Sequence, residues 1–192
     1  MEKNTELYEY AKALANVKLI RWQDMPEFSI YSDQLLQLVR DELSFMSFNG
    51  DVLVTKSMVN NYVKWGMMPK PVKKKYDKLQ IVYVLVITIL KPIMPIMKIK
   101  EGIQLQTLIE GHENAYNSFC CAFEESLREV FVPVIEQRHT YAFKERNITA
   151  DKLAISSITL ALSSKLLTEK IIETKISKLA KSNQSEGDSH DK

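Results

Sequence analysis

Apolar residues recur at helical spacing along most of the chain, and this pattern predicts a mainly α-helical fold. Residues 6–17 are the first amphipathic segment. Residues 33–46 are the second, which begins after the interruption at Pro26 with Ser32 or Asp33 as the N-cap. Each segment carries its leucine and valine side chains on one stripe, which we expect to face a core.

Residues 55–66 predict a short helix with one polar face. Thr55 is a good N-cap and Gly66 a good C-cap, and two prolines downstream prevent further helix. Helical spacing places Met58, Val59, Tyr62 and Trp65 on the inner face, and Lys56, Ser57, Asn60, Asn61 and Lys64 on the outer face. We expect Asn61 to point outward and Asn60 to lie nearer the helix edge.

Residues 79–90 are the most apolar stretch, LQIVYVLVITIL. A helix that crosses a bilayer needs about 20 apolar residues, so this segment is predicted to lie in the core. Its valine and isoleucine content would also suit a strand, and periodicity cannot decide where nearly every position is apolar. The length favours a buried helix over residues 79–91.

Two further helices are predicted before the chain reaches its last third. Residues 96–109 resume the helical pattern, with a break expected at Gly102. Residues 114–137 form a longer amphipathic segment, with a kink or break expected at Pro133.

The last helix is predicted from residue 149 to about residue 179. Residues 182–192 contain no apolar side chain and are expected to be disordered. These segments divide the chain into a helical domain at residues 1–110 and a C-terminal helical region at residues 111–181. The wide apolar surface of the C-terminal region suggests a homodimer interface or a pocket for a small-molecule effector.

Positive charge is concentrated in residues 54–78, where seven lysines face the single acid Asp77. This segment carries a charge of +6, although the whole chain carries +2. Asparagine can form a bidentate pair with adenine, and lysine neutralises phosphate, so a helix with both beside a lysine-rich loop indicates a nucleic-acid surface. The alternative is a solvated helix face.

Residues 54–78, together with the apolar segment after them, resemble a motif of a known protein family. The order TKSMVNNYVKWGMMPKP, a basic loop ending in KKKYDK and an apolar helix resembles the winged helix-turn-helix of MerR-type regulators. The resemblance implies a positioning helix at about residues 33–46, a recognition helix at 55–66, a wing at 67–78 and a third helix at 79–91. Where that family has an arginine-bearing turn, this chain has asparagine, tyrosine and lysine.

A second resemblance covers roughly residues 20–110. The segments MPEFSIYSDQL, TKSMVNNYVKWGMMPKPVKKKY and ILK resemble an uncharacterised bacterial family, the YkrK-like domain of unknown function. This resemblance brings no known activity with it.

Together, the charge and the resemblance predict a transcriptional regulator that binds double-stranded DNA. The residues expected to contact DNA are Thr55, Lys56, Ser57, Asn60, Asn61, Lys64, Lys70, Lys73, Lys74, Lys75 and Tyr76. A second hypothesis is a helical protein-interaction module whose lysine-rich loop docks an acidic partner. RNA binding is least favoured, because the basic segment lacks a cluster of exposed aromatic side chains on which unpaired bases could stack.

Candidate catalytic and metal-binding residues are few. The three histidines, His112, His139 and His190, are far apart in the sequence, and no glycine-rich phosphate loop is present. Cys120 and Cys121 are adjacent, which disfavours a disulfide between them and a shared metal site. We therefore expect no enzyme, cofactor or metal. With no signal peptide or membrane span in the sequence, a cytoplasmic protein is expected.

Overall fold

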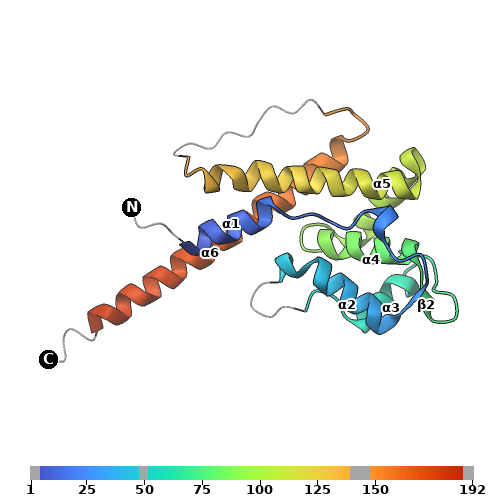
Figure 1. Cartoon of the computed structure of the whole chain (residues 1–192), viewed down its shortest axis with the longest axis horizontal. Coiled ribbons are helices and arrows are strands. Elements are labelled where there is room, and N and C mark those ends of the chain that lie inside the picture. The colour runs from blue at the N-terminus through green and yellow to red at the C-terminus, as the bar shows by residue number, and fades with distance from the viewer. Residues whose placement is uncertain (1–4, 48–51, 139–147, 188–192) are drawn as a thin grey trace. The chain divides into compact units, whose positions relative to one another are not determined.

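The computed structural model describes residues 5–47, 52–138 and 148–187 (Figure 1). It is mainly helical, as the sequence predicts. The elements in chain order are α1 (Thr5–Ala15), η1 (Trp22–Asp24), β1 (Ile30–Tyr31), α2 (Ser32–Glu42), η2 (Ser44–Met46), α3 (Lys56–Lys64), β2 (Lys75–Tyr76), α4 (Lys78–Leu90), α5 (Ile96–Ile135) and α6 (Leu153–Gly187).

The chain separates into two compact units, which are described individually. The central unit comprises residues 18–122, and the terminal unit comprises residues 1–17 and 123–192. This division differs from the boundary at residue 110 that the sequence suggests, because α1 packs against α6. The two helices are far apart in the chain, and the apolar pattern of each one does not show that it contacts the other.

In the central unit, α2 packs against both α3 and α4. It begins at Ser32, where the Gln34 side chain accepts a hydrogen bond of 2.9 Å from the Tyr31 amide. It ends at Glu42, four residues earlier than the sequence indicates, and the short 3₁₀ helix η2 covers the remainder of the predicted segment. The apolar stripe of α2, which includes Leu35 and Val39, is buried.

The apolar segment forms a helix, α4, as its length predicts. Its N-cap is Asp77, whose carboxylate accepts hydrogen bonds from the amides of Leu79 and Gln80. Gln80 in turn accepts a 2.7 Å hydrogen bond from the Asp77 amide, which completes a capping box. Most residues of α4 are buried, which explains why apolar side chains occur around its whole circumference.

Helix α5 is interrupted at Gly111 and continues through Gly102, where the sequence suggests a break. Gly111 has φ +78° and ψ 168°, a conformation that is nearly exclusive to glycine. Pro133 lies inside the last turn, and the helix continues past it to Ile135, so the kink or break expected at Pro133 is not seen and the non-helical backbone of α5 is at Gly111 instead.

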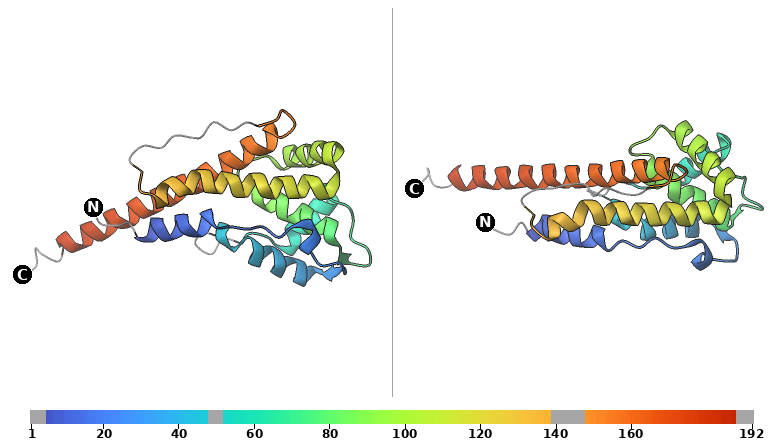
Figure 2. Two further views of the ribbon diagram at one scale, coloured as in Figure 1. Left: turned by 45° about the horizontal axis from the view of Figure 1, so that its top comes forward. Right: turned by 90° about the horizontal axis from the view of Figure 1, so that it is seen from above.

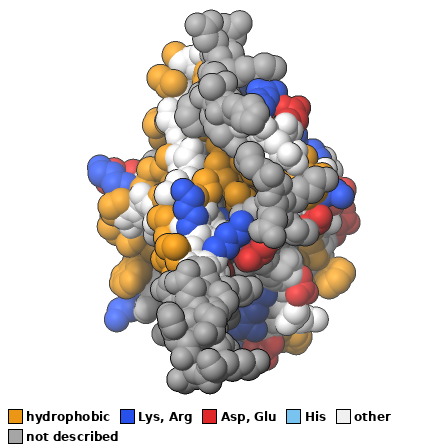
Figure 3. Space-filling model, turned by 90° about the vertical axis from the view of Figure 1, so that its left-hand side faces the viewer, with side chains coloured by type: hydrophobic (Ala, Val, Ile, Leu, Met, Phe, Trp, Pro, Cys, Tyr) orange, Lys and Arg blue, Asp and Glu red, His pale blue; other side chains and the backbone are white. Residues whose placement is uncertain are grey.

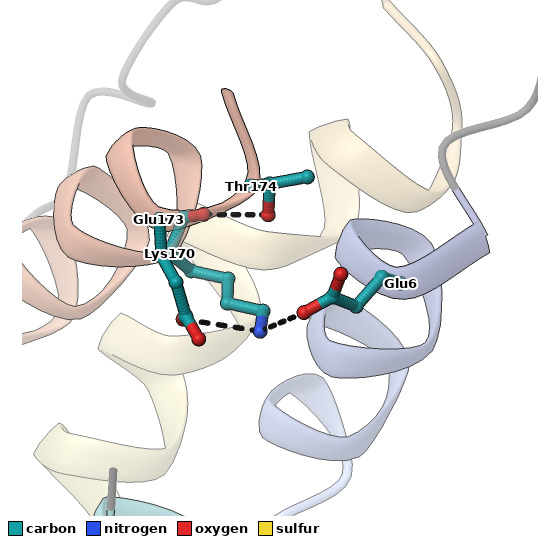
Figure 4. A network of polar contacts seen from close by, with 4 residues as sticks. All are labelled: Glu6, Lys170, Glu173 and Thr174. Atoms are coloured by element: carbon teal, nitrogen blue, oxygen red, sulfur yellow. Dashed lines mark hydrogen bonds and ion pairs between the residues drawn. The ribbon is translucent and has the colours of Figure 1, made fainter. Parts of the chain in front are cut away.

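In the terminal unit, α1 lies alongside α6 (Figures 1 and 2). Lys170 of α6 is largely buried, and its Nζ lies 2.6 Å from a Glu6 carboxylate oxygen and 3.2 Å from one of Glu173 (Figure 4). Burial by itself lowers the pKa of Lys170, but hydrogen bonds to Glu6 and Glu173 outweigh it and raise the pKa above its ordinary value. The Tyr10 and Phe131 rings meet edge to face in the same unit.

Helix α6 extends to Gly187, so residues 182–187 are helical where disorder is expected from the sequence. The remaining five residues lie outside the described part of the chain.

Three apolar side chains of α6, Ile172, Ile176 and Leu179, are more than half exposed. Figure 3 shows a face of the molecule on which apolar side chains lie among charged ones. Within the described residues, no helix is long and apolar enough to cross a membrane.

Candidate nucleic-acid interface

The start of α3 is held by a side-chain cap and by the lysine that follows α4. Thr55 accepts a 3.2 Å hydrogen bond from the Met58 amide, as its sequence position predicts. The Lys91 ammonium, just after α4, donates to the Leu53 carbonyl and lies 3.7 Å from the Met58 sulfur. Burial lowers the pKa of Lys91. These contacts attach the beginning of α3 to the end of the buried helix.

The polar face of α3 is exposed along its length. Val59 and Tyr62 are buried, and Lys56, Ser57, Asn60 and Lys64 are exposed. Asn61 is only half-buried, whereas Asn60 is exposed. This is the reverse of the orientation expected from the sequence. At about 100° per residue, Asn60 lies about 160° around the helix from the buried Tyr62, whereas Asn61 lies only about 100° from it.

Trp65, expected on the inner face, is 47% exposed. It is the C-cap of α3, and Gly66 after it has φ +63°. The Gly66 amide donates to the Val63 carbonyl and the Met67 amide to the Tyr62 carbonyl, which is a Schellman motif. This turn redirects the chain and buries Met67, so the tryptophan ring is left toward solvent.

The lysine-rich loop forms a tight turn between α3 and α4. The Lys75 amide donates a 2.9 Å hydrogen bond to the Val72 carbonyl. The two residues between them, Lys73 and Lys74, have φ of 49° and 62°. Positive φ at both central positions is typical of a type I′ turn, which favours Asn-Gly. The turn therefore presents two exposed lysines in a backbone conformation that lysine rarely adopts.

Strand β2, which follows this turn, pairs antiparallel with β1. Tyr76 lies opposite Ile30, and only 5% of Tyr76 is exposed. Burial also raises the pKa of Tyr76. Tyr76, one of the residues expected to contact DNA, therefore lies in the core and not on the exposed surface.

The other residue pair of the ribbon joins Tyr31 to Lys75. The Lys75 ammonium lies 4.9 Å from the centroid of the Tyr31 ring. The Tyr31 residue is 57% exposed, and Phe28, three residues before it, is 71% exposed. Sequence reasoning missed both aromatic residues, because the only signal is strand pairing across more than 40 positions of the chain.

Of the predicted site residues, two groups are exposed in the central unit. The first is the outer face of α3, and the second is the loop that carries Lys70, Lys73 and Lys74. Lys100 adds to the first group, since its ammonium donates a 3.4 Å hydrogen bond to the Trp65 carbonyl. Residues 54–100 hold ten lysines and one acid. The exposed lysines of both groups can neutralise phosphates, and the exposed Asn60 can pair with a base edge.

In the described ranges, no group of three or more histidine, cysteine or carboxylate residues could hold a metal ion. Cys120 is buried and Cys121 is exposed. The arrangement that remains is a basic, largely polar surface on a compact helical scaffold.

These features define a small, mainly helical domain in which a lysine-rich turn connects a short helix to a buried one. Residues 20–119 match a family described as a domain of unknown function, DUF1836, and the chain belongs to this family. The match covers just over half of the chain and lies within the central unit. No match is found among curated proteins or among solved structures.

Proposed function

We propose that the central unit binds double-stranded DNA as a winged helix-turn-helix and serves as a transcriptional regulator. In this proposal α3 enters the major groove and the turn at Lys73 and Lys74 lies on the phosphate backbone. The observation that carries the proposal is this turn, which holds two adjacent ammonium groups outward on strained backbone. Strain of this kind is concentrated at functional sites.

The exposed face of α3 supports the same proposal. Lys56 and Ser57 lie in its first turn, and Asn60 lies one turn further along the same helix. A recognition helix meets base edges with residues near its N-terminus, whereas its lysines contact phosphates. The absence of arginine from residues 54–78 favours adenine over guanine as the base that is read.

The test uses a substitution that removes charge and improves the turn. Lys73→Asn with Lys74→Gly introduces the pair that a type I′ turn favours, so the fold should be kept or stabilised. Two lost phosphate contacts should reduce the slope of log K against log salt by about 1.8, from about 0.9 per contact. Binding should be measured by fluorescence anisotropy on mixed-sequence duplexes at several salt concentrations.

A matched control removes two exposed lysines from α6, Lys175→Ala with Lys178→Ala, and changes the net charge by the same amount. The salt slope of this control should equal that of the wild type. An unchanged slope in the turn variant would exclude the turn from the interface. Tighter binding to an acidic polypeptide such as polyglutamate than to duplex DNA would instead support the protein-interaction alternative.

A further inference from the structure

We propose that Tyr31, with Lys75 beside it, is a stacking site for an unpaired nucleobase. This inference rests on the proposed nucleic-acid binding. It adds that the preferred ligand is a duplex in which one base lies outside the stack. The Tyr31 ring is exposed at the end of the lysine-rich turn, and the Lys75 ammonium lies 4.9 Å from the ring centroid. An aromatic face combined with a nearby cation is the usual arrangement for holding an unstacked nucleotide.

The ring is carried by a rigid part of the central unit. Strand pairing places Tyr31 opposite Lys75, and the neighbouring pair, Ile30 and Tyr76, is buried. The Tyr31 amide is also hydrogen-bonded to Gln34, which attaches this position to the first turn of α2. A side chain on such a framework loses little freedom on stacking, so the site is organised before the ligand arrives.

The surroundings favour a nucleotide as the occupant. Val72, which is bridged to Lys75, is also largely exposed, and Lys73 and Lys74 follow it directly at the tip of the turn. Apolar surface next to several ammonium groups is complementary to a base that carries a phosphate. The base would lie on the open part of the Tyr31 ring, and Lys75 would neutralise its phosphate.

The experiment compares three oligonucleotides with the full-length chain. One is a perfect duplex that contains 2-aminopurine, the second is the same duplex with the 2-aminopurine as an unpaired bulge, and the third is the single strand. The bulged duplex should bind about tenfold more tightly than the perfect one, from the usual strength of stacking on one aromatic ring. The 2-aminopurine fluorescence should be quenched on binding.

The variants separate stacking from other effects. Tyr31→Ala should abolish the tenfold preference and the quenching, and Tyr31→Phe should retain both, because phenylalanine keeps the aromatic face. Trp65→Ala is the matched control, since it removes an exposed aromatic residue elsewhere in the central unit and should change neither. Thermal unfolding of each variant by circular dichroism shows that the comparison is made on folded protein.

Each outcome decides the proposal. Equal affinity for bulged and perfect duplexes, or a preference that survives Tyr31→Ala, overturns the stacking site and leaves duplex binding unaffected. Tyr31-dependent binding and quenching on the single strand without duplex binding retain the stacking site and overturn the proposed duplex interface. Failure of all three oligonucleotides to bind overturns both.

Discussion

Asn60 is the accessible asparagine of α3, and Asn61 is half-buried. The opposite orientation was expected from the sequence, but helical spacing of about 100° per residue places Asn60 about 160° from the buried Tyr62 and Asn61 only about 100° from it. Once Trp65 is placed at the C-cap, the buried side of α3 is defined by Val59 and Tyr62. The exposure of Asn60 therefore follows from the helical spacing of α3 and depends on no contact with a distant part of the chain.

If α3 reads DNA, Asn60→Ala should relax the preference for adenine at one base pair and cost about 1–3 kcal/mol there. Asn61→Ala is the matched control and should leave the selected sequence intact. Lys64→Ala should lower affinity for all sequences equally, because a phosphate contact carries no sequence information. Selection from random duplexes with the wild type and the three variants would measure this. A motif that survives Asn60→Ala excludes this helix as the reader.

At the scale of elements, the two glycines of α5 show how the same residue type has opposite effects. Gly102 lies inside regular helix, and Gly111 interrupts it at φ +78°. The side chain of Glu110 spans the interruption, since it accepts hydrogen bonds from Gln106 at 2.9 Å and Ser118 at 2.7 Å. These contacts fix the direction of the helix after Gly111.

Replacing each glycine by alanine gives a matched pair of predictions. Gly102→Ala should stabilise the chain by about 0.5–1 kcal/mol, because the helix is regular there and an added Cβ meets no atom within 4 Å. Gly111→Ala should destabilise it by about 1–3 kcal/mol through backbone strain alone, since there too the Cβ meets no neighbour within 4 Å. Urea denaturation followed by circular dichroism would measure both. Equal effects of the two substitutions would contradict the assigned kink.

At the scale of the whole molecule, α6 carries an apolar stripe that its own unit leaves uncovered. Ile172, Ile176 and Leu179 are spaced by four and three residues, so they lie on one side of the helix. Isolated exposed apolar residues are common on protein surfaces, but a row at heptad spacing is typical of a seam between helices. The homodimer expected from the sequence stays a prediction, and this row is the place on α6 at which it can be tested.

Ile176→Glu should convert such a dimer to a monomer, because it places a like charge from each protomer in the seam. Lys178→Glu is the control: it also adds negative charge to an exposed position of α6 but lies off the stripe. Sedimentation equilibrium on the wild type and both variants would show the difference. A wild-type chain that remains monomeric at high concentration would contradict the prediction.

The local sequence determined the elements of this protein, because their signals lie within a few residues. Thr55 as a cap, Gly66 after the end of α3, and the helical state of the apolar segment all follow from neighbours along the chain. The charge of the lysine-rich turn is equally a local property. These features needed no knowledge of distant contacts.

Only the tertiary structure decided which side chains share a surface. Pairing of β1 with β2 buried Tyr76 and brought Tyr31 next to Lys75, and packing of α1 on α6 joined two segments from opposite ends of the chain. Likewise, Trp65 is exposed whereas Met67, two residues later, is buried. Contacts of this kind depend on which of several compatible apolar faces meet, and local patterns specify the faces without specifying their partners.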